Sequence, residues 1–381
     1  MKAKKVVVGI LMAAMVVSFV GCGKEEKKKV KTQKEASAQN AATNNLKDAY
    51  KDDFSVGVAI NSYQLEDEDT LTLVKENFNS ITMENEMKPE NVLDWEGSES
   101  SKDGMPKINT GNLDRVLSLA KESGLKLRGH TLVWHNQTPN WFFCENYDES
   151  NDLVSKDVME KRMESYIKQV LTYCQDNYPG VVYAWDVVNE AMGDGGGYRT
   201  ERSKWYDIFG EEFVEKAFTY ARKYAAKDVK LFYNDYNSYE DEKRNMIFAT
   251  ASKLKEKNLI DGIGMQSHWS MDYPAVHSIE RAIEKFGELG LEIQLTEIDM
   301  HNTDDSEEGL KAQAERYAEI FTMLKDLDKG TANITNVTFW GLNDDVTWLT
   351  NFKGETSYPL LFDSDNERKP AYDSILKVAG K

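Results

Sequence analysis

The chain has 381 residues, 40% of them hydrophobic, which is enough for one large globular domain with a sizeable core. Its formal net charge of -18 at pH 7 argues against nucleic acid as a partner, because phosphate groups would be repelled, whereas a neutral sugar polymer is indifferent to that charge. No long apolar run follows the first 20 residues, which excludes a polytopic membrane protein.

The N-terminus has the pattern of an export signal. Three lysines within the first five residues precede an apolar run over 6–20, which is short for a membrane span. We therefore predict a signal peptide over residues 1–21. The run ends in Phe-Val-Gly-Cys, which resembles a bacterial lipobox, so Cys22 is the expected lipidation site. Plain secretion stays open, because Phe19 stands where a leucine is usual. We expect an exported protein, either secreted or held at the cell surface by a lipid, with no other contact to the membrane.

The next segment differs in composition from the rest of the chain. Residues 22–49 are rich in Lys, Glu, Ala, Gln, Asn and Ser and show no apolar periodicity, which predicts a flexible tether. A single catalytic domain is predicted over 50–381, and we expect it to act as a monomer. Cys144 and Cys174 either pair as a disulfide or remain free and buried, and the sequence leaves both possibilities open.

Short apolar runs alternate with longer amphipathic segments from residue 54 onward. Helical spacing of apolar residues is clear over 157–177, 211–226 and 278–290. Eight such strand-then-helix units in one domain predict an α/β fold, the closed parallel (β/α)8 TIM barrel. The eight predicted strands span 54–60, 80–86, 125–133, 181–190, 230–237, 261–269, 292–299 and 336–344.

Polar and aromatic residues gather where these predicted strands end. Active sites of such barrels lie at the C-terminal ends of the strands, where the loops converge. A single polar strand end can be a simple cap, but seven strands carry them, which predicts one functional rim. The residues are Glu84 to Lys88, His130, Trp134, His135, Asn189, Glu190, Asn234, Tyr236, Gln266, His268, Glu297, Asp299, Trp340 and Trp348.

Two glutamates end largely apolar strands on opposite sides of the predicted barrel mouth. Glu190 and Glu297 can face each other across a bound chain, as hydrolysis of a glycosidic bond requires. His268 and Asp299 are placed to hold Glu297 ionised, which fits a nucleophile, and Asn189 can contact a sugar hydroxyl. Retention of configuration then requires the two carboxyl groups to stand about 5–5.5 Å apart. We expect the charge of Glu297 and partial burial to raise the pKa of Glu190.

Five motifs stand in order along the chain. They are Gly-His-Thr-Leu-Val-Trp-His at 129–135, Trp-Asp-Val-Val-Asn-Glu-Ala at 185–191, Tyr-Asn-Asp-Tyr-Asn at 233–237, Gln-Ser-His at 266–268 and Thr-Glu-Ile-Asp at 296–299. Together they resemble glycoside hydrolase family 10, the endo-β-1,4-xylanases, over about residues 54–378. The resemblance implies a retaining barrel enzyme with Glu190 as acid/base and Glu297 as nucleophile.

The same resemblance implies how a xylan chain is bound, with no cofactor and no metal. Flat rings suit the apolar faces of pyranoses, while amide and amino groups suit their hydroxyls. The implied −2 and −1 site residues are Glu84, Asn85, Lys88, His130, Trp134, Gln137, Asn189, Gln266 and His268, with Trp340 and Trp348 closing over these sugars and Tyr236 stacking at the +1 site.

Three other interpretations remain at this point. A β-1,4-glucanase barrel would use the same pair of glutamates. A metal-dependent hydrolase could use the histidines at the rim as ligands, which are His130, His135, His268 and His301. The third is a sugar-binding lipoprotein without activity.

Overall fold

The computed structural model describes residues 44–380 of the chain. The predicted signal peptide, the lipidation site Cys22 and most of the predicted tether lie outside the described residues.

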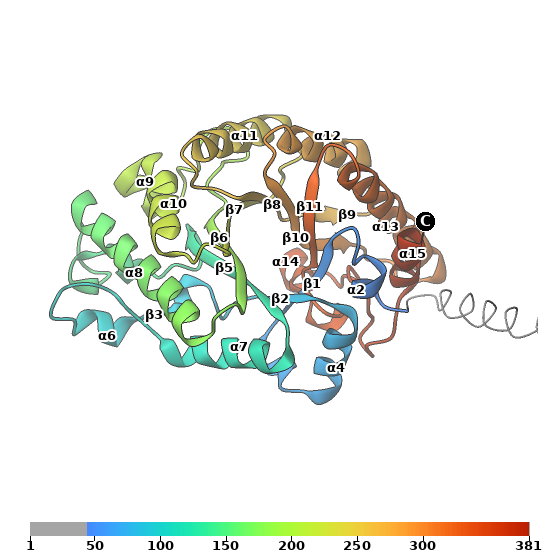
Figure 1. Cartoon of the computed structure of the whole chain (residues 1–381), viewed down its shortest axis with the longest axis horizontal. Helices are drawn as coiled ribbons and strands as arrows, with labels where there is room; N and C mark the ends of the chain where they lie inside the picture. The colour runs from blue at the N-terminus through green and yellow to red at the C-terminus, as the bar shows by residue number, and fades with distance from the viewer. Residues whose placement is uncertain (1–43, 381) are drawn as a thin grey trace, which may run out of the picture. The chain divides into compact units, whose positions relative to one another are not determined.

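Eight parallel strands close into a barrel, and helices surround it (Figure 1). The ring closes because the last strand pairs with the first, with Val56 opposite Val337. This confirms the predicted (β/α)8 TIM barrel. In ring order the strands are β1 (Ser55–Ile60), β2 (Ser80–Met83), β5 (Lys126–Trp134), β6 (Val182–Asn189), β7 (Lys230–Asp235), β8 (Gly262–Met265), β10 (Glu292–His301) and β11 (Asn333–Phe339).

One predicted strand is divided in two. The run predicted over 261–269 forms β8 and, after a break, the short strand β9 (His268–Ser270). The break falls at Ser267, whose φ of 70° lies in the left-handed region and interrupts the extended chain. Strand β9 then pairs with the far end of β10, with His268 opposite Asp299. The break therefore places these two side chains next to each other.

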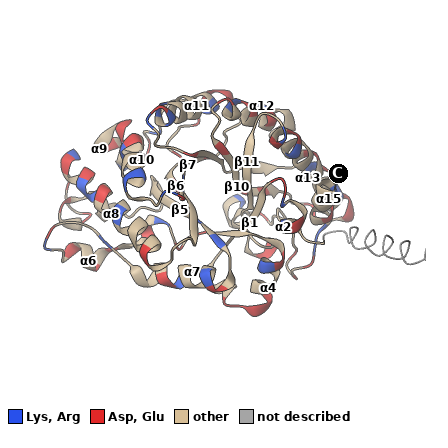
Figure 2. Ribbon diagram, viewed as in Figure 1, with Lys and Arg blue, Asp and Glu red and all other residues tan. Residues whose placement is uncertain are grey.

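Helices cover the outside of the barrel because each buries one apolar face against the strands. In α12, for example, Ile279, Ile283 and Phe286 recur at helical spacing and are fully buried. Lys, Arg, Asp and Glu residues lie mainly along the outer helices (Figure 2). No helix within residues 44–380 is both long and apolar enough to cross a membrane. The longer helices are α4 (Glu68–Asn77), α7 (Thr110–Ser123), α8 (Lys156–Asn177), α10 (Glu212–Tyr224), α11 (Asp241–Glu256), α12 (Val276–Gly287), α13 (Glu307–Asp328) and α15 (Pro370–Ala379).

Shorter elements lie in the connections between strands and helices. A two-stranded antiparallel sheet forms after β2. The elements are α2 (Leu46–Ala49), α3 (Ser62–Leu65), α5 (Pro89–Val92), β3 (Leu93–Asp94), α6 (Trp95–Glu99), β4 (Lys107–Ile108), η1 (Asn140–Phe143), η2 (Glu145–Tyr147), α9 (Lys204–Phe209), η3 (Asp344–Val346) and α14 (Trp348–Lys353).

The fold extends further toward the N-terminus than the predicted boundary at residue 50. Helix α2 is capped by Asn45, and Leu46 is fully buried in the core. The hydroxyl of Tyr50 donates a hydrogen bond of 2.6 Å to the carbonyl of Ile375 in α15. Residues 44–49 thus belong to the folded domain and not to a tether, because helix α2 packs against α4, β1 and α15.

The two cysteines of the domain do not form a disulfide. Cys144 and Cys174 are both free and buried. Burial raises the pKa of the Cys174 thiol to about 12, so this side chain is a neutral part of the core.

Candidate active site

A cleft of about 680 Å³ opens at the C-terminal ends of the barrel strands. The residues that the sequence assigned to catalysis or substrate binding line it, except Asp299, which lies behind His268. The lining residues that the sequence predicted are Glu84, Asn85, Lys88, His130, Trp134, Gln137, Asn189, Glu190, Tyr236, Gln266, His268, Glu297, Trp340 and Trp348.

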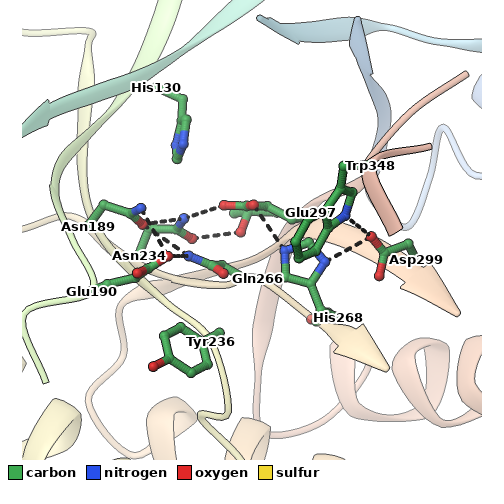
Figure 3. A network of polar contacts seen from close by, with 12 residues as sticks. His130, Asn189, Glu190, Asn234, Tyr236, Gln266, His268, Glu297, Asp299 and Trp348 are labelled. Atoms are coloured by element: carbon green, nitrogen blue, oxygen red, sulfur yellow. Dashed lines mark hydrogen bonds and ion pairs between the residues drawn. The ribbon is translucent and has the colours of Figure 1, made fainter. Parts of the chain in front are cut away.

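Glu297 on β10 is buried and held by two donors (Figure 3). The side-chain amide of Asn234 donates a hydrogen bond of 2.7 Å to Oε1. Nε2 of His268 lies 3.2 Å from Oε2. Each carboxylate oxygen therefore has its own donor, which fixes the orientation of the group.

His268 bridges two carboxylates. Its Nδ1 lies 2.9 Å from Oδ2 of Asp299, and Nε1 of Trp348 donates a hydrogen bond of 2.8 Å to the same oxygen. Burial by itself lowers the pKa of His268, but the charge of Asp299 and the hydrogen bonds to Asp299 and Glu297 raise it to about 10. The imidazole is thus a cation at neutral pH and donates one N–H to each carboxylate.

The protonated His268 helps to keep Glu297 an anion. Burial favours its neutral form, but the hydrogen bond from His268, the charges of His130 and His268, and the amide of Asn234 outweigh burial. The pKa of Glu297 falls to about 2. The expected Glu297–His268–Asp299 arrangement is therefore present and keeps Glu297 ionised.

Glu190 follows the last residue of β6 in an uncommon backbone conformation. Its φ of 56° lies in the left-handed region, and its N–H donates a hydrogen bond of 2.9 Å to the carbonyl of Asn234. The side-chain amide of Gln266 donates a hydrogen bond of 2.9 Å to Oε1. The chain turns at this residue, and neighbouring strands hold both its backbone and its carboxyl group.

The pKa of Glu190 is raised, in the direction expected from the sequence. Burial is the main cause, and the negative charge of Asp235 is the second. The charge of Glu297, expected to be a principal cause, contributes less than Asp235. The pKa values of the two carboxyl groups in the cleft are thus shifted in opposite directions, upward for Glu190 and downward for Glu297.

Three amides form a layer between the carboxyl groups (Figure 3). Oδ1 of Asn189 accepts hydrogen bonds from Asn234, at 3.0 Å, and from Gln266, at 3.2 Å. The hydroxyl of Thr296 donates to Oδ1 of Asn234 at 2.6 Å. The sequence places Asn234 at the predicted rim, within the Tyr-Asn-Asp-Tyr-Asn motif, but predicts no role for it, and the structure shows that it joins Asn189 to Glu297.

A buried ion pair supports His130. Arg128 and Asp186 are fully buried and form a two-pronged salt bridge across β5 and β6. Nδ1 of His130 lies 2.9 Å from Oδ2 of Asp186, and Nε of Arg128 donates to Oε1 of Gln294 at 2.9 Å. The imidazole is thereby fixed at the floor of the cleft.

One end of the cleft is built around Lys88. Its Nζ donates to Oε1 of Gln137 at 2.7 Å and to Oδ1 of Asn85 at 3.3 Å, and it lies 5.1 Å from the ring centroid of Trp134. Oε1 of Glu84 is buried without a hydrogen-bond partner among residues 44–380. A buried polar atom without a partner is costly, so this oxygen is suited to a contact with a bound ligand.

The other end of the cleft contains residues that the sequence did not indicate as site residues. Nη2 of Arg199 donates to the hydroxyl of Tyr236 at 2.6 Å, and this hydroxyl also contacts Asp194 at 3.0 Å. Burial and then the charges of Arg199 and Arg202 lower the pKa of His135 to about 4. The two arginines lie in a long loop without a motif, so only the fold brings them to the cleft.

The histidines considered as metal ligands do not share a centre. His130 pairs with Asp186, His268 with Glu297 and Asp299, and His301 with Ser357 at 2.9 Å. Within residues 44–380, no group of three or more His, Cys, Asp or Glu side chains is arranged to hold a metal ion.

Comparison with known proteins agrees with this geometry. The family model "Glycosyl hydrolase family 10" matches residues 45–378. The chain belongs to this family. As a member of glycosyl hydrolase family 10, it is 47% identical over 340 residues to endo-1,4-beta-xylanase B of Butyrivibrio fibrisolvens, covering 88% of this chain but 53% of the relative. It is also 48% identical over 304 residues to a putative endo-1,4-beta-xylanase of Caldicellulosiruptor saccharolyticus, covering 77% of this chain and 96% of the relative.

Solved structures of xylanases share the fold of this family member. A Clostridium thermocellum endo-1,4-beta-D-xylanase, solved with xylohexaose, matches with a TM-score of 0.80 at 38% identity, over 88% of this chain and 67% of that chain. The intracellular xylanase of Thermoanaerobacterium saccharolyticum matches with a TM-score of 0.77 at 38% identity, over 87% of this chain and 97% of that chain.

The charge on His268 can be measured directly. Because its pKa of about 10 lies above the usual 6.5, its stabilising effect is complete below pH 6.5 and is lost as the pH rises through 10. We expect ¹⁵N NMR to find this imidazole protonated at pH 8, and Asp299→Asn to lower its pKa by more than one unit. The signal of His277, exposed on α12, should not respond to the substitution. A neutral His268 at pH 8 in the unsubstituted protein would contradict this assignment.

Proposed function

We propose that this protein is an endo-1,4-β-xylanase that cleaves internal xylosidic bonds of xylan with retention of anomeric configuration. The observation that carries the proposal is the pair Glu190 and Glu297 in one cleft, with the pKa of the first raised and that of the second lowered to about 2. A double displacement needs one carboxylic acid and one carboxylate in this arrangement.

The relatives support xylan as the substrate. The two relatives described above are named endo-1,4-beta-xylanases, and solved structures of similar chains hold xylohexaose or xylotriose. Because the chain spans about half the length of the Butyrivibrio relative, the proposal concerns the activity of the domain that matches the family model.

In the first step, a carboxylate oxygen of Glu297 attacks the anomeric carbon while the bond to the leaving oxygen breaks. Glu190 donates its proton to that oxygen, and the product is a glycosyl-enzyme ester. In the second step, Glu190, now a carboxylate, takes a proton from water as the water attacks the anomeric carbon. The ester bond breaks and Glu297 leaves as a carboxylate.

His268 and Asp299 serve this cycle by holding the nucleophile. The imidazolium keeps Glu297 ionised and oriented before attack, and Asp299 keeps the imidazole charged. Asn189 contacts Glu190 directly and is linked to Glu297 through Asn234, and it can contact the sugar 2-hydroxyl, a contact that strengthens in the transition state.

The sugars of the substrate would bind at the two ends of the cleft. Glycone sugars would contact the end built around Lys88, where Glu84 carries a buried oxygen free for a ligand. The leaving sugar would stack on Tyr236 at the other end. The other residues assigned to substrate binding are Asn85, His130, Gln137, Gln266, Trp340 and Trp348.

The substrate assignment is tested by comparing two polymers. We expect reducing sugar to be released from linear xylan at a rate on the order of 10²-fold above that from carboxymethylcellulose, because each glucose unit carries a hydroxymethyl group that xylose lacks and that a site fitted to xylose has to exclude. Comparable rates on both polymers would favour a β-1,4-glucanase. Release from neither would favour a binding protein without activity.

The role of Glu190 is tested by Glu190→Gln. Loss of a general acid should lower the rate on xylan by roughly 10²- to 10⁴-fold. Formation of the glycosyl-enzyme from an aryl xyloside with a good leaving group should be largely spared, because that group needs little protonation. Stopped-flow measurement of the aryl alcohol released in the first turnover separates the steps. Equal loss on both substrates would contradict the acid/base role.

Glu297→Gly is the matched comparison variant. It should be inactive on both substrates, and azide added to it should restore cleavage of the aryl xyloside with inverted product, because azide takes the place of the nucleophile. In the unsubstituted enzyme, NMR of the first product should show the β-anomer. An α-configured first product would contradict retention and the expected spacing of about 5–5.5 Å between the two carboxyl groups.

We also propose that the protein is exported and held at the cell surface by a lipid on Cys22. The three early lysines, the short apolar run and the lipobox-like end support this proposal, and they lie in residues 1–22. A surface location suits an enzyme whose substrate is a polymer outside the cell.

Detergent partitioning tests the lipid anchor. In a bacterial host that processes lipoproteins, the mature protein should enter the detergent phase, because a lipid chain adds a large apolar surface. Cys22→Ala should move it to the aqueous phase without altering the activity of the domain. An unsubstituted protein that stays aqueous, with a free N-terminus beyond residue 22, would indicate plain secretion.

A further inference from the structure

Helix α11 places one lysine inside the fold. Lys243 is fully buried, and the steps described above do not use it. Its Nζ lies 2.9 Å from Oδ1 of Asp235 and 3.0 Å from Oδ1 of Asp194. The same Nζ lies 3.3 Å from the ring centroid of Tyr236. A buried charge is costly unless it is paired, so these contacts account for the stability of the ammonium group there.

Asp235 is the buried partner in this pair. It is fully buried at the end of β7, where it accepts hydrogen bonds from the hydroxyl of Tyr233 and from the N–H of Tyr236 at 2.9 Å. The N–H of Met192 lies 3.4 Å from Oδ2. Within residues 44–380, the cationic side chain that contacts this carboxylate is Lys243.

Asp235 lies close to the turn that carries Glu190. The preceding residue, Asn234, accepts the N–H of Glu190 with its carbonyl, and Met192 contacts Asp235 only two residues after Glu190. Four charged groups influence Glu190: Asp235 from β7, Glu297 from β10, Lys88 beyond β2 and Arg199 from the loop after β6. Among the carboxylates, Asp235 has the larger effect.

The ring of Tyr236 lies against the same lysine, Lys243. Its hydroxyl is held by Arg199 and Asp194, and the ammonium group of Lys243 lies against its face. Three contacts, with Asp235, Asp194 and Tyr236, thus join Lys243 on α11 to the strand end and the loop at the leaving-group end of the cleft.

We propose that Lys243 is a positioning residue of the active site, which keeps Asp235 an anion beneath Glu190 and fixes the ring of Tyr236. The proposal rests on the proposed function only for the roles given to Glu190 and Tyr236. The contacts of Lys243 with Asp235, Asp194 and Tyr236 stand without it.

The physical reason lies in the burial of Asp235, which raises the pKa of this carboxyl group, while the charge of Lys243 and its hydrogen bond oppose the rise. A fully buried carboxylate that loses its cation takes up a proton instead of remaining charged. A neutral Asp235 no longer repels the ionised form of Glu190. Glu190 then gives up its proton at a lower pH, so the general acid is lost at a pH where the unsubstituted protein still has it.

The experiment measures the protonation of Glu190 itself, so that it does not depend on any activity. Protein labelled with ¹³C at the glutamate carboxyl group is titrated by NMR, and the signal missing from Glu190→Gln identifies Glu190. Lys243→Met should lower the pKa of Glu190 by about one unit. Asp235→Asn should lower it at least as much, because the charge of Lys243 then remains.

Two further variants complete the test. The double variant Lys243→Met with Asp235→Asn has no unpaired buried charge, which favours folding, and should show the same shift as Lys243→Met alone. Asp194→Asn removes the exposed partner of Lys243 and should leave the pKa of Glu190 unchanged. An unchanged pKa in Lys243→Met or in the double variant, or an equal shift in Asp194→Asn, would overturn the proposal.

Kinetics then separates this inference from the proposed function. If the unsubstituted protein hydrolyses xylan, the basic limb of its kcat/KM profile should move to lower pH in Lys243→Met by the shift that NMR finds. If it hydrolyses no xylan, the proposed function fails, while the NMR titration still decides whether Lys243 acts on Glu190 through Asp235.

Discussion

The proton on His268 is the feature on which the site depends. It makes the imidazole a cation between two buried carboxylates, and each of its N–H groups is used, one by Glu297 and one by Asp299. Without that proton, two negative charges would face each other across a neutral ring in a buried place, and at least one would become protonated. The anionic state of Glu297 is therefore a property of three side chains from two strands, and it follows from the pairing of β9 with β10.

Two further buried pairs of opposite charge support the site. Arg128 with Asp186, and Lys243 with Asp235, are fully buried pairs of opposite charge beneath the cleft. A buried ion pair of this kind adds little net stability, because removing both charges from water costs about as much as their attraction returns. Their role is to position groups of the active site. The first pair orients His130, and the second places a negative charge near Glu190.

The two glutamates differ because their surroundings differ. Both are buried, which by itself favours the neutral form of each. Glu297 receives hydrogen bonds from a cation and an amide, and these reverse the effect of burial. Glu190 has one close amide donor and a negative neighbour in Asp235, and these leave the effect of burial in place. One cleft can therefore hold an acid and an anion at the same pH, which is the condition for a double displacement.

The sequence by itself determined the barrel and the residues at its rim. Alternating apolar runs and helical segments depend on local spacing, and strand ends converge in any such barrel, so Glu190 and Glu297 could be placed without coordinates. Tertiary structure alone decided what surrounds them. Lys243 belongs to an ordinary amphipathic helix, and Arg199 to a loop without a motif, so nothing local marks them. The same holds for the start of the fold, because Leu46 is buried by residues far along the chain. Burial and charge pairing arise between segments distant in sequence, and these set the protonation of each carboxyl group.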